Sequence, residues 1–324
     1  MADFFQRALG LSITASCPIA CPHCIVEAGP HRRETIELDV ARSALSQAAA
    51  FDDGRIRSVV FTGGEPFFRP HLLDSLIAQA DALGFVVSVM TNAFWARDAE
   101  RALEFLRVHP HISQLTVSTD RNHRLFIPIS AVRNAVRAAK ALSIPVSVAV
   151  CLESMEDLEP SFCEVSDFCE PEKIRFSFAL PAGRAAAHDP QTDRPPCSPE
   201  THDACASLDV PLIFPDGRVL ACMGMVPSLP LRHPLYLGAV TEEPLEAILN
   251  RGRASEFIAL MRRSACADAT RALGLTSASA EGLRRFRRFG NCALCYALLA
   301  DSGLLDEVSA ALGDGGSRSA DGAR

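Results

Sequence analysis

The sequence predicts an α/β protein, built as an open, partial (β/α)6 parallel barrel with a small second domain. Three observations lead to this prediction. The chain has 324 residues, about twice the length of a typical domain. Short apolar runs alternate with amphipathic segments through its first half, and this alternation stops near residue 185. A strand, a helix and a further apolar strand form a parallel βαβ unit, and six such units suffice for a partial barrel but not for an eight-fold one.

The strands are expected where short runs are rich in Val, Ile, Phe and Ser, and the helices where apolar residues recur every three or four positions. The predicted strands are Leu9–Ala15, Arg57–Gly63, Phe85–Asn92, Gln114–Asp120, Pro145–Glu153 and Ile174–Pro181. The predicted helices are Leu38–Phe51, Pro70–Leu83, Asp98–Val108, Ser130–Leu142 and Met155–Cys169.

The second domain is expected to begin after a stretch rich in Pro and Asp, which has the composition of a linker. We therefore divide the chain into the barrel (1–184), the linker (185–204), an extension (205–302) and a tail (303–324) whose end cannot bury apolar surface. The turn sequence Pro215-Asp216-Gly217 predicts a hairpin of two flanking strands. The elements predicted for the extension are strands Val210–Phe214 and Arg218–Ala221 and helices Glu242–Asn250, Ala254–Arg263, Glu281–Arg288 and Ala293–Leu299.

Composition and charge exclude several classes of protein. Hydrophobic residues make up 48% of the chain and charged residues 22%, as in folded globular domains. The net charge of −7 gives no electrostatic reason to bind nucleic acid or anionic lipid. The chain has neither a signal peptide nor an apolar run that spans a membrane, so a cytoplasmic location is expected. In a reducing compartment, the 12 cysteines favour metal ligation over disulfides.

Three cysteines follow the first predicted strand as a C-x3-C-x2-C group: Cys17, Cys21 and Cys24. Barrels of this type carry their chemistry at the C-terminal ends of the strands. Thiolates bind zinc and iron–sulfur clusters alike, and three ligands leave one metal position open for a substrate or cofactor. The alternative is a structural zinc with His23 or a distant residue as the fourth ligand, although His23 lies between two of the cysteines and could hardly complete the same tetrahedron.

This cysteine group resembles the hallmark of the radical SAM enzymes. The second predicted strand ends in Thr62-Gly63-Gly64-Glu65-Pro66, which is similar to the Gly-Gly-Glu motif of that family. The resemblance implies a [4Fe-4S] cluster on the three cysteines and S-adenosylmethionine on the open iron. It also implies reductive cleavage to a 5′-deoxyadenosyl radical, with a flavodoxin or ferredoxin as electron donor.

The same resemblance assigns roles to residues at the strand ends. Gly63 and Gly64 would let the backbone approach the methionyl end of the cofactor, and Glu65 would accept a hydrogen bond from its ammonium group. The later strand ends would supply further polar contacts to the cofactor, and Pro181-Ala182-Gly183-Arg184 resembles the Pro-x-Gly-Arg that precedes the extension in the family. These further cofactor-binding candidates are Thr91, Asn92, Ser118 and Arg184.

Asp120, which ends the fourth predicted strand, and His123, three residues later, are expected to face the substrate and are the catalytic candidates. For His123, an ordinary solvated loop residue is the alternative. Phe94 and Trp95 are expected in the core. Turn chemistry alone could explain each of the later strand-end matches taken singly.

A second cysteine set is expected in the extension. It resembles the opening of a SPASM or twitch domain, and its shortness favours the twitch version, which has one auxiliary [4Fe-4S] cluster. Zinc is the alternative occupant. The predicted ligands are Cys205, Cys222, Cys292 and Cys295, with Cys197 and Cys266 in reserve. Cys151, Cys163 and Cys169 are expected to be buried thiols. The Arg-rich run of residues 283–289 is expected to be a solvated helix face or a patch for an anionic partner.

The resemblance leaves the substrate open. Most SPASM and twitch relatives modify ribosomally made peptides, so oxidative modification of a peptide is expected, with dehydrogenation of a small-molecule alcohol or sugar as the alternative. The first predicted strand starts within ten residues of Met1, so we expect no fused leader-binding domain and a separate leader-peptide-binding protein as a partner. A non-catalytic zinc or iron–sulfur redox sensor is the alternative from a different class.

Overall fold

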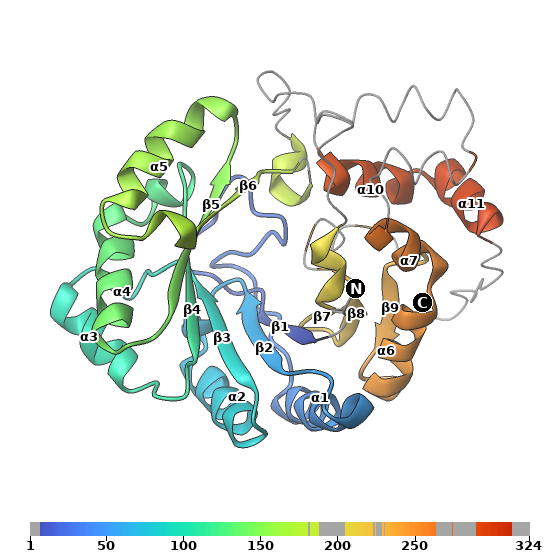
Figure 1. The fold of residues 1–324 in the computed structure, drawn as a ribbon, viewed down its shortest axis with the longest axis horizontal. Helices are drawn as coiled ribbons and strands as arrows, with labels where there is room; N and C mark the ends of the chain where they lie inside the picture. Colours follow the sequence, from blue (N-terminus) through green and yellow to red (C-terminus); the bar gives the residue numbers. More distant parts are fainter. Residues whose placement is uncertain are drawn as a thin grey trace.

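The computed structural model describes residues 7–180, 182–187, 205–222, 224, 229, 231–263, 274 and 290–312. One nine-stranded sheet runs through these residues in the order β6-β5-β4-β3-β2-β1-β7-β8-β9. Figure 1 shows that the sheet curves without closing, and that helices α1 to α5 lie on the outer side of the curve.

The first six strands form the predicted partial barrel. Each neighbouring pair from β1 to β6 is parallel, and a helix lies between consecutive strands in the chain. The strands are β1 (Ala8–Thr14), β2 (Ser58–Gly63), β3 (Val86–Thr91), β4 (Gln114–Thr119), β5 (Val146–Leu152) and β6 (Ile174–Phe178). The helices are α1 (Leu38–Ala50), α2 (Pro70–Ala82), α3 (Ala99–Arg107), α4 (Ile129–Ala141) and α5 (Leu158–Ser166). The prediction of an open α/β barrel is confirmed.

The core lies between the sheet and the outer helices. Leu9, Leu11 and Ile13 alternate along β1 and are fully buried, because every second side chain of a strand points to the same face. Ala131 and Ala135 recur at helical spacing on the buried face of α4, where small side chains let a helix lie close to the strands. The other face of β1 carries Ser12 and Thr14 and is therefore polar.

The extension continues the sheet of the barrel. Strand β7 (Leu212–Ile213) pairs in parallel with β1, with Gly10 opposite Leu212. Strand β8 (Arg218–Leu220) then pairs antiparallel with β7, which confirms the predicted hairpin. At its turn Gly217 has a φ of 86°, a value that favours glycine. The remaining elements of the extension are β9 (Tyr236–Ala239), α6 (Leu245–Ala254), α7 (Glu256–Arg263), α10 (Gly290–Ala300) and α11 (Ser302–Ala311).

Three features differ from the sequence prediction. Strand β9 was not expected, and α11 occupies the start of the predicted tail, where the Asp301 carboxylate caps it by accepting from the Leu304 N–H. The prediction that Cys163 is buried is wrong: it is exposed on α5, because it does not lie on the face of that helix that buries Val165. The predicted helix at 281–288 and residues 188–204 and 313–324 lie outside the described residues.

None of the described helices is both long and apolar enough to cross a bilayer.

Candidate active site

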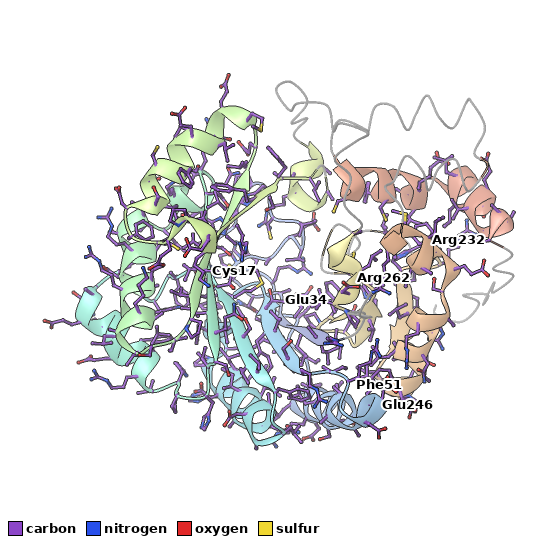
Figure 2. The ribbon with its side chains drawn as sticks, in the orientation of Figure 1. Cys17, Glu34, Phe51, Arg232, Glu246 and Arg262 are labelled. Atoms are coloured by element: carbon purple, nitrogen blue, oxygen red, sulfur yellow. The ribbon has the colours of Figure 1, made fainter. Side chains whose placement is uncertain are left out.

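The first three cysteines lie in the loop that follows β1. Cys17 and Cys21 are buried and Cys24 is partly exposed. The loop folds back on itself, since the Cys17 N–H donates to the Gly29 carbonyl (3.2 Å) and the Cys24 N–H to the Cys21 carbonyl (3.1 Å). Figure 2 shows Cys17 near the middle of the view, between the barrel and the extension.

The surroundings of these thiols favour binding of a metal. Burial raises the pKa of both Cys17 and Cys21 to about 12, so the charged form needs compensation, which a bound metal ion supplies. The Asn92 amide donates to Cys17 Sγ (3.5 Å), and the backbone N–H of Ile19 bonds to the same sulfur. Such N–H donors stabilise a ligating thiolate.

The spacing of the sulfurs indicates which metal centre fits. A single zinc ion, with Zn–S bonds of about 2.3 Å, holds its cysteine sulfurs about 4 Å apart. Across the described ranges, the one group of three potential ligands with donor atoms within 4.8 Å of one another is His23, Asp120 and His123. The three cysteine sulfurs are therefore spread more widely than one zinc requires. In an iron–sulfur cluster each cysteine can bind a different iron, so the residues present fit a cluster better.

Gly63 and Gly64 allow the β2 turn to pack against the end of β1. Gly63 has a φ of 135°, and a Cβ there would lie 2.4 Å from the Thr14 carbonyl oxygen. A Cβ on Gly64 would lie 2.2 Å from the Ser16 carbonyl oxygen. Backbone thus fills the space beside the missing Cβ atoms, and the glycines join the turn to the start of the cysteine loop. Their contact with the methionyl end of the cofactor stays a prediction.

Glu65 lies at the centre of a buried hydrogen-bond network. Its Oε1 accepts from the Thr91 hydroxyl (2.9 Å) and the Phe67 N–H (3.2 Å), and its Oε2 accepts from the Asn92 N–H (2.8 Å). Burial raises its pKa to about 7, although these bonds oppose the shift. Because a carboxylate has about four acceptor positions, one position on Oε2 remains for a further donor such as an ammonium group.

Two of the other predicted cofactor contacts belong to this network. The Thr91 hydroxyl also accepts from the indole of Trp95 (3.0 Å). Asn92 connects Glu65 to Cys17 through its backbone and its side-chain amide. Ser118 lies apart from this network, half-buried near the end of β4, and its alternation with buried Val117 turns it to the polar inner face.

Arg184 holds the cysteine loop from the far end of the barrel. Its Nε donates to the Cys21 carbonyl (2.9 Å), its Nη2 to the Ala28 carbonyl (2.7 Å) and its backbone N–H to the Cys24 carbonyl (3.1 Å). The structure therefore assigns Arg184 contacts to the cysteine loop, and its contact with the cofactor stays a prediction. Pro181, from the same motif, lies outside the described residues.

Asp120 and His123, the catalytic candidates, contact each other and a third residue. Asp120 Oδ2 lies 2.6 Å from His123 Nδ1 and 3.3 Å from His23 Nε2. We did not predict His23 to be part of this group, although a histidine between two cysteine ligands was a usable signal. The sequence could not show that its ring points toward the end of β4.

The second cysteine set is partly assembled. A Cβ on Gly224 would lie 3.7 Å from Cys222 Sγ and 4.0 Å from Cys292 Sγ, so both sulfurs pack against Gly224. Burial, together with the nearby Cys205, raises the pKa of Cys222 to about 12 and that of Cys292 to about 11. Cys295 follows one turn after Cys292 on α10. Cys197, Cys266 and the Arg-rich run lie outside the described residues.

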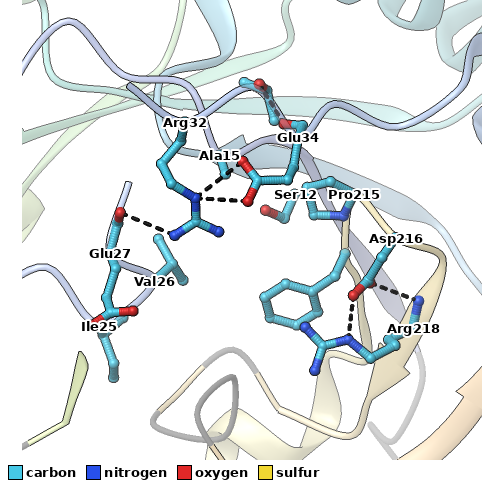
Figure 3. A pocket seen from close by; sticks show the side chains of 12 residues that line it. Ser12, Ala15, Ile25, Val26, Glu27, Arg32, Glu34, Pro215, Asp216 and Arg218 are labelled. Atoms are coloured by element: carbon cyan, nitrogen blue, oxygen red, sulfur yellow. Dashed lines mark hydrogen bonds and ion pairs between the residues drawn. The ribbon is translucent and has the colours of Figure 1, made fainter. Parts of the chain in front are cut away.

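A cavity of about 190 Å³ lies between the cysteine loop and the hairpin of the extension (Figure 3). Arg32 Nε donates to both carboxylate oxygens of Glu34 (2.8 and 3.0 Å). Across the cavity Arg218 Nε donates to Asp216 (2.5 Å). The lining residues are Ser12, Thr14, Ala15, Ile25, Val26, Glu27, Arg32, Glu34, Phe214, Pro215, Asp216 and Arg218. Both halves of the molecule thus contribute paired charges to one cavity, which apolar side chains such as Val26 and Phe214 also line.

An unclosed parallel barrel with three cysteines and a Gly-Gly-Glu turn at its mouth defines a metal-dependent enzyme that uses a bound cofactor. Residues 11–160 match the model of the radical SAM superfamily. These residues are a radical SAM domain, and such a domain implies S-adenosylmethionine and a [4Fe-4S] cluster as cofactors.

Similar proteins include two kinds of cyclase. The GTP 3′,8-cyclase 1 of Pseudomonas aeruginosa is 24% identical over 312 residues, which cover 78% of this chain and 91% of the relative. The PqqA peptide cyclase of Xanthomonas campestris pv. campestris is 37% identical over 86 residues, which cover 25% of this chain and 21% of the relative. A solved structure described as "Native anSMEcpe with bound AdoMet" aligns over 94% of this chain and 96% of its own, with a TM-score of 0.56 and 14% identity. The similarity to this solved structure is a similarity of fold.

Proposed function

We propose that this radical SAM enzyme carries an auxiliary [4Fe-4S] cluster in a twitch-like extension and oxidatively modifies a ribosomally made peptide. The observation that carries the proposal is the second set of thiols, in which the sulfurs of Cys222 and Cys292 pack beside Gly224 and the nearby Cys205 contributes to the raised pKa of both. With Cys295 this set has four protein ligands. Four ligands leave no open iron, which suits electron transfer better than substrate binding.

The cavity between the two halves, lined by charged pairs and by apolar side chains, supports a peptide-like substrate. Its charges occur as neighbouring opposite pairs, Arg32 with Glu34 and Arg218 with Asp216, which suit a polar ligand with hydrogen-bonding groups of both kinds. Similarity to a peptide cyclase over 86 residues points in the same direction. A flavodoxin or ferredoxin would supply electrons, and a separate leader-binding protein could present the peptide.

The residues of the chain would prepare the site as follows. Glu65, held by Thr91 and Asn92, would accept a hydrogen bond from the cofactor's ammonium group. The cluster and S-adenosylmethionine supply, when bound, the radical that abstracts hydrogen from the substrate. Loss of a second electron and a proton then completes a two-hydrogen oxidation. Asp120 and His123 are the candidates to receive the proton.

Oxidation of a small molecule, as in dehydrogenation of an alcohol or sugar, is the second candidate. It is favoured by the alignment over 91% of a relative whose name specifies a nucleotide substrate.

The first experiment is anaerobic reconstitution followed by iron analysis and incubation with S-adenosylmethionine and dithionite. We expect about eight irons per chain, four in each cluster, and slow formation of 5′-deoxyadenosine without substrate. The variant with Cys17, Cys21 and Cys24 replaced by Ala should keep about four irons and form no 5′-deoxyadenosine. Once a substrate is found, a product lighter by two hydrogens supports oxidation, whereas an unchanged mass contradicts it.

A further inference from the structure

His23, Asp120 and His123 form a compact group beside the cysteine loop. Asp120 directly follows β4, His123 lies one turn later, and His23 comes from the loop between Cys21 and Cys24. Their potential ligand atoms all lie within 4.8 Å of one another. Asp120 is 2% exposed, and the side chains of His23 and His123 are 10% and 17% exposed. The group is therefore largely shielded from water.

The Asp120 carboxylate is held in one orientation by the backbone. Its Oδ1 accepts from the N–H groups of Asn122 (2.8 Å) and His123 (2.9 Å). The Asn122 side chain is itself fixed, because its amide donates to the Glu153 carboxylate (2.8 Å). Oδ2 is thereby directed at the two imidazoles, and such outer hydrogen bonds are what orient the ligands of metal sites.

The distances match those between neighbouring ligands of one metal ion. Metal–nitrogen and metal–oxygen bonds of about 2.0–2.2 Å place adjacent ligand atoms about 3 Å apart. Asp120 Oδ2 lies 3.3 Å from His23 Nε2 and 2.6 Å from His123 Nδ1. A small movement of these side chains would therefore make room for an ion between them. Two imidazoles with one carboxylate are a set that binds divalent first-row metals and leaves positions open.

We propose that His23, Asp120 and His123 bind one divalent transition-metal ion, in a site separate from the two cysteine sets. The ion would lie between the imidazole nitrogens and Asp120 Oδ2, and its remaining coordination positions would be open.

The test is binding of Mn²⁺ to the reconstituted, chelator-washed holoenzyme, measured by the electron paramagnetic resonance signal of the free ion. Mn²⁺ is chosen because carboxylates and water suit it and thiolates do not. We expect the wild-type chain to bind one Mn²⁺. Asp120→Asn and His123→Gln should each weaken binding by more than about tenfold. His123→Gln lies in a partly exposed turn, so it remains informative if Asp120→Asn does not fold.

Asp81→Asn is the matched control. Asp81 contacts His111 (2.8 Å) in an exposed pair, which offers a metal ion two potential ligands where the proposed site offers three. This variant should bind Mn²⁺ as the wild type does. Wild-type protein that binds no Mn²⁺ stoichiometrically, or equal binding by wild type and both site variants, overturns the proposal. Because the measurement uses neither substrate nor turnover, its failure would leave the proposed peptide oxidation intact.

Discussion

A buried carboxylate can fix the positions of neighbouring groups as well as bind a ligand. In this structure Glu65 fixes neighbouring groups through hydrogen bonds. It is 1% exposed and accepts three hydrogen bonds, from Phe67, Thr91 and Asn92. Each donor would be left unpaired and buried if the carboxylate were removed. An unsatisfied buried group costs about 1–3 kcal/mol. Glu65→Gln and Glu65→Ala should therefore differ in their effects.

Glu65→Gln should fold, because its amide oxygen can keep accepting from Thr91 and Phe67, although its NH2 group then faces the Asn92 N–H. It should bind S-adenosylmethionine more weakly by about 1.5–3 kcal/mol through loss of a charge-assisted hydrogen bond. Glu65→Ala should lower the free energy of unfolding by at least about 3 kcal/mol. Equilibrium binding of the cofactor and urea denaturation separate the two effects. If Glu65→Gln binds the cofactor as tightly as wild type, Glu65 has an organising role alone.

His233 gives the extension a dependence on pH. It is 4% exposed, its Nδ1 accepts from the Leu235 N–H (3.1 Å), and its Nε2 has no partner among the described residues. Burial, together with the nearby charge of Arg218, lowers its pKa to about 4. Between about pH 6.5 and pH 4 the unfolded chain therefore binds a proton at this residue that the folded chain does not.

Because of this difference, the free energy of unfolding should fall by about 3 kcal/mol as the pH decreases from 6.5 to 4, and should not change further through His233 above 6.5. His233→Phe should flatten this part of the profile, measured by urea denaturation at several pH values. His71→Phe, on the exposed start of α2, is the control. An unchanged slope in His233→Phe would show that other groups cause the acid sensitivity.

At the scale of elements, the turn after β2 fixes the geometry of the cluster loop. The Gly64 N–H donates to the Thr14 carbonyl (2.6 Å) and the Glu65 N–H to the Ser16 carbonyl (3.0 Å). The β1 and β2 ends are thereby joined beyond their last paired residues. Arg184 holds the same loop from the opposite end of the barrel.

Gly64→Ala should destabilise the fold by about 3 kcal/mol or more, because its Cβ would lie 2.2 Å from a backbone oxygen that has no room to move. Gly84→Ala is the matched control. Gly84 has a φ of 83° and nothing within 4 Å of an added Cβ, so it should lose about 1 kcal/mol from backbone strain alone. Equal losses, measured by thermal or urea unfolding, would contradict the close packing at Gly64.

At the scale of the whole molecule, the extension and the barrel share one sheet. Strand β7 pairs with β1, and Gln47 of α1 accepts from the Leu245 N–H at the start of α6 (2.8 Å). The two cysteine sets nevertheless lie on separate loops and helices. Loss of the second metal centre should therefore leave the first one intact.

Replacing Cys292 and Cys295 by Ala should remove about four irons per chain while slow 5′-deoxyadenosine formation without substrate continues. Conversion of a substrate, once known, should stop, because the second electron has no acceptor. Cys163→Ala, at an exposed thiol outside both sets, is the control and should keep the full iron content. Loss of all iron from the double variant would show that the two centres assemble together.

The sequence by itself determined the radical SAM domain, its barrel and the positions of the first cysteines. Local spacing encodes these features: the βα alternation, the C-x3-C-x2-C group, and Pro215-Asp216-Gly217 at a hairpin whose glycine has a φ of 86°. Short elements such as β9 escaped prediction because four residues carry too little periodicity.

The tertiary structure decided how distant residues combine. It placed backbone where Gly63 and Gly64 lack a side chain, turned Arg184 onto the cysteine loop, and brought His23 to Asp120. It also added the extension to the sheet of the barrel through β1 and β7. These contacts depend on the directions of side chains from separate strand ends, and no local pattern of residues encodes such directions.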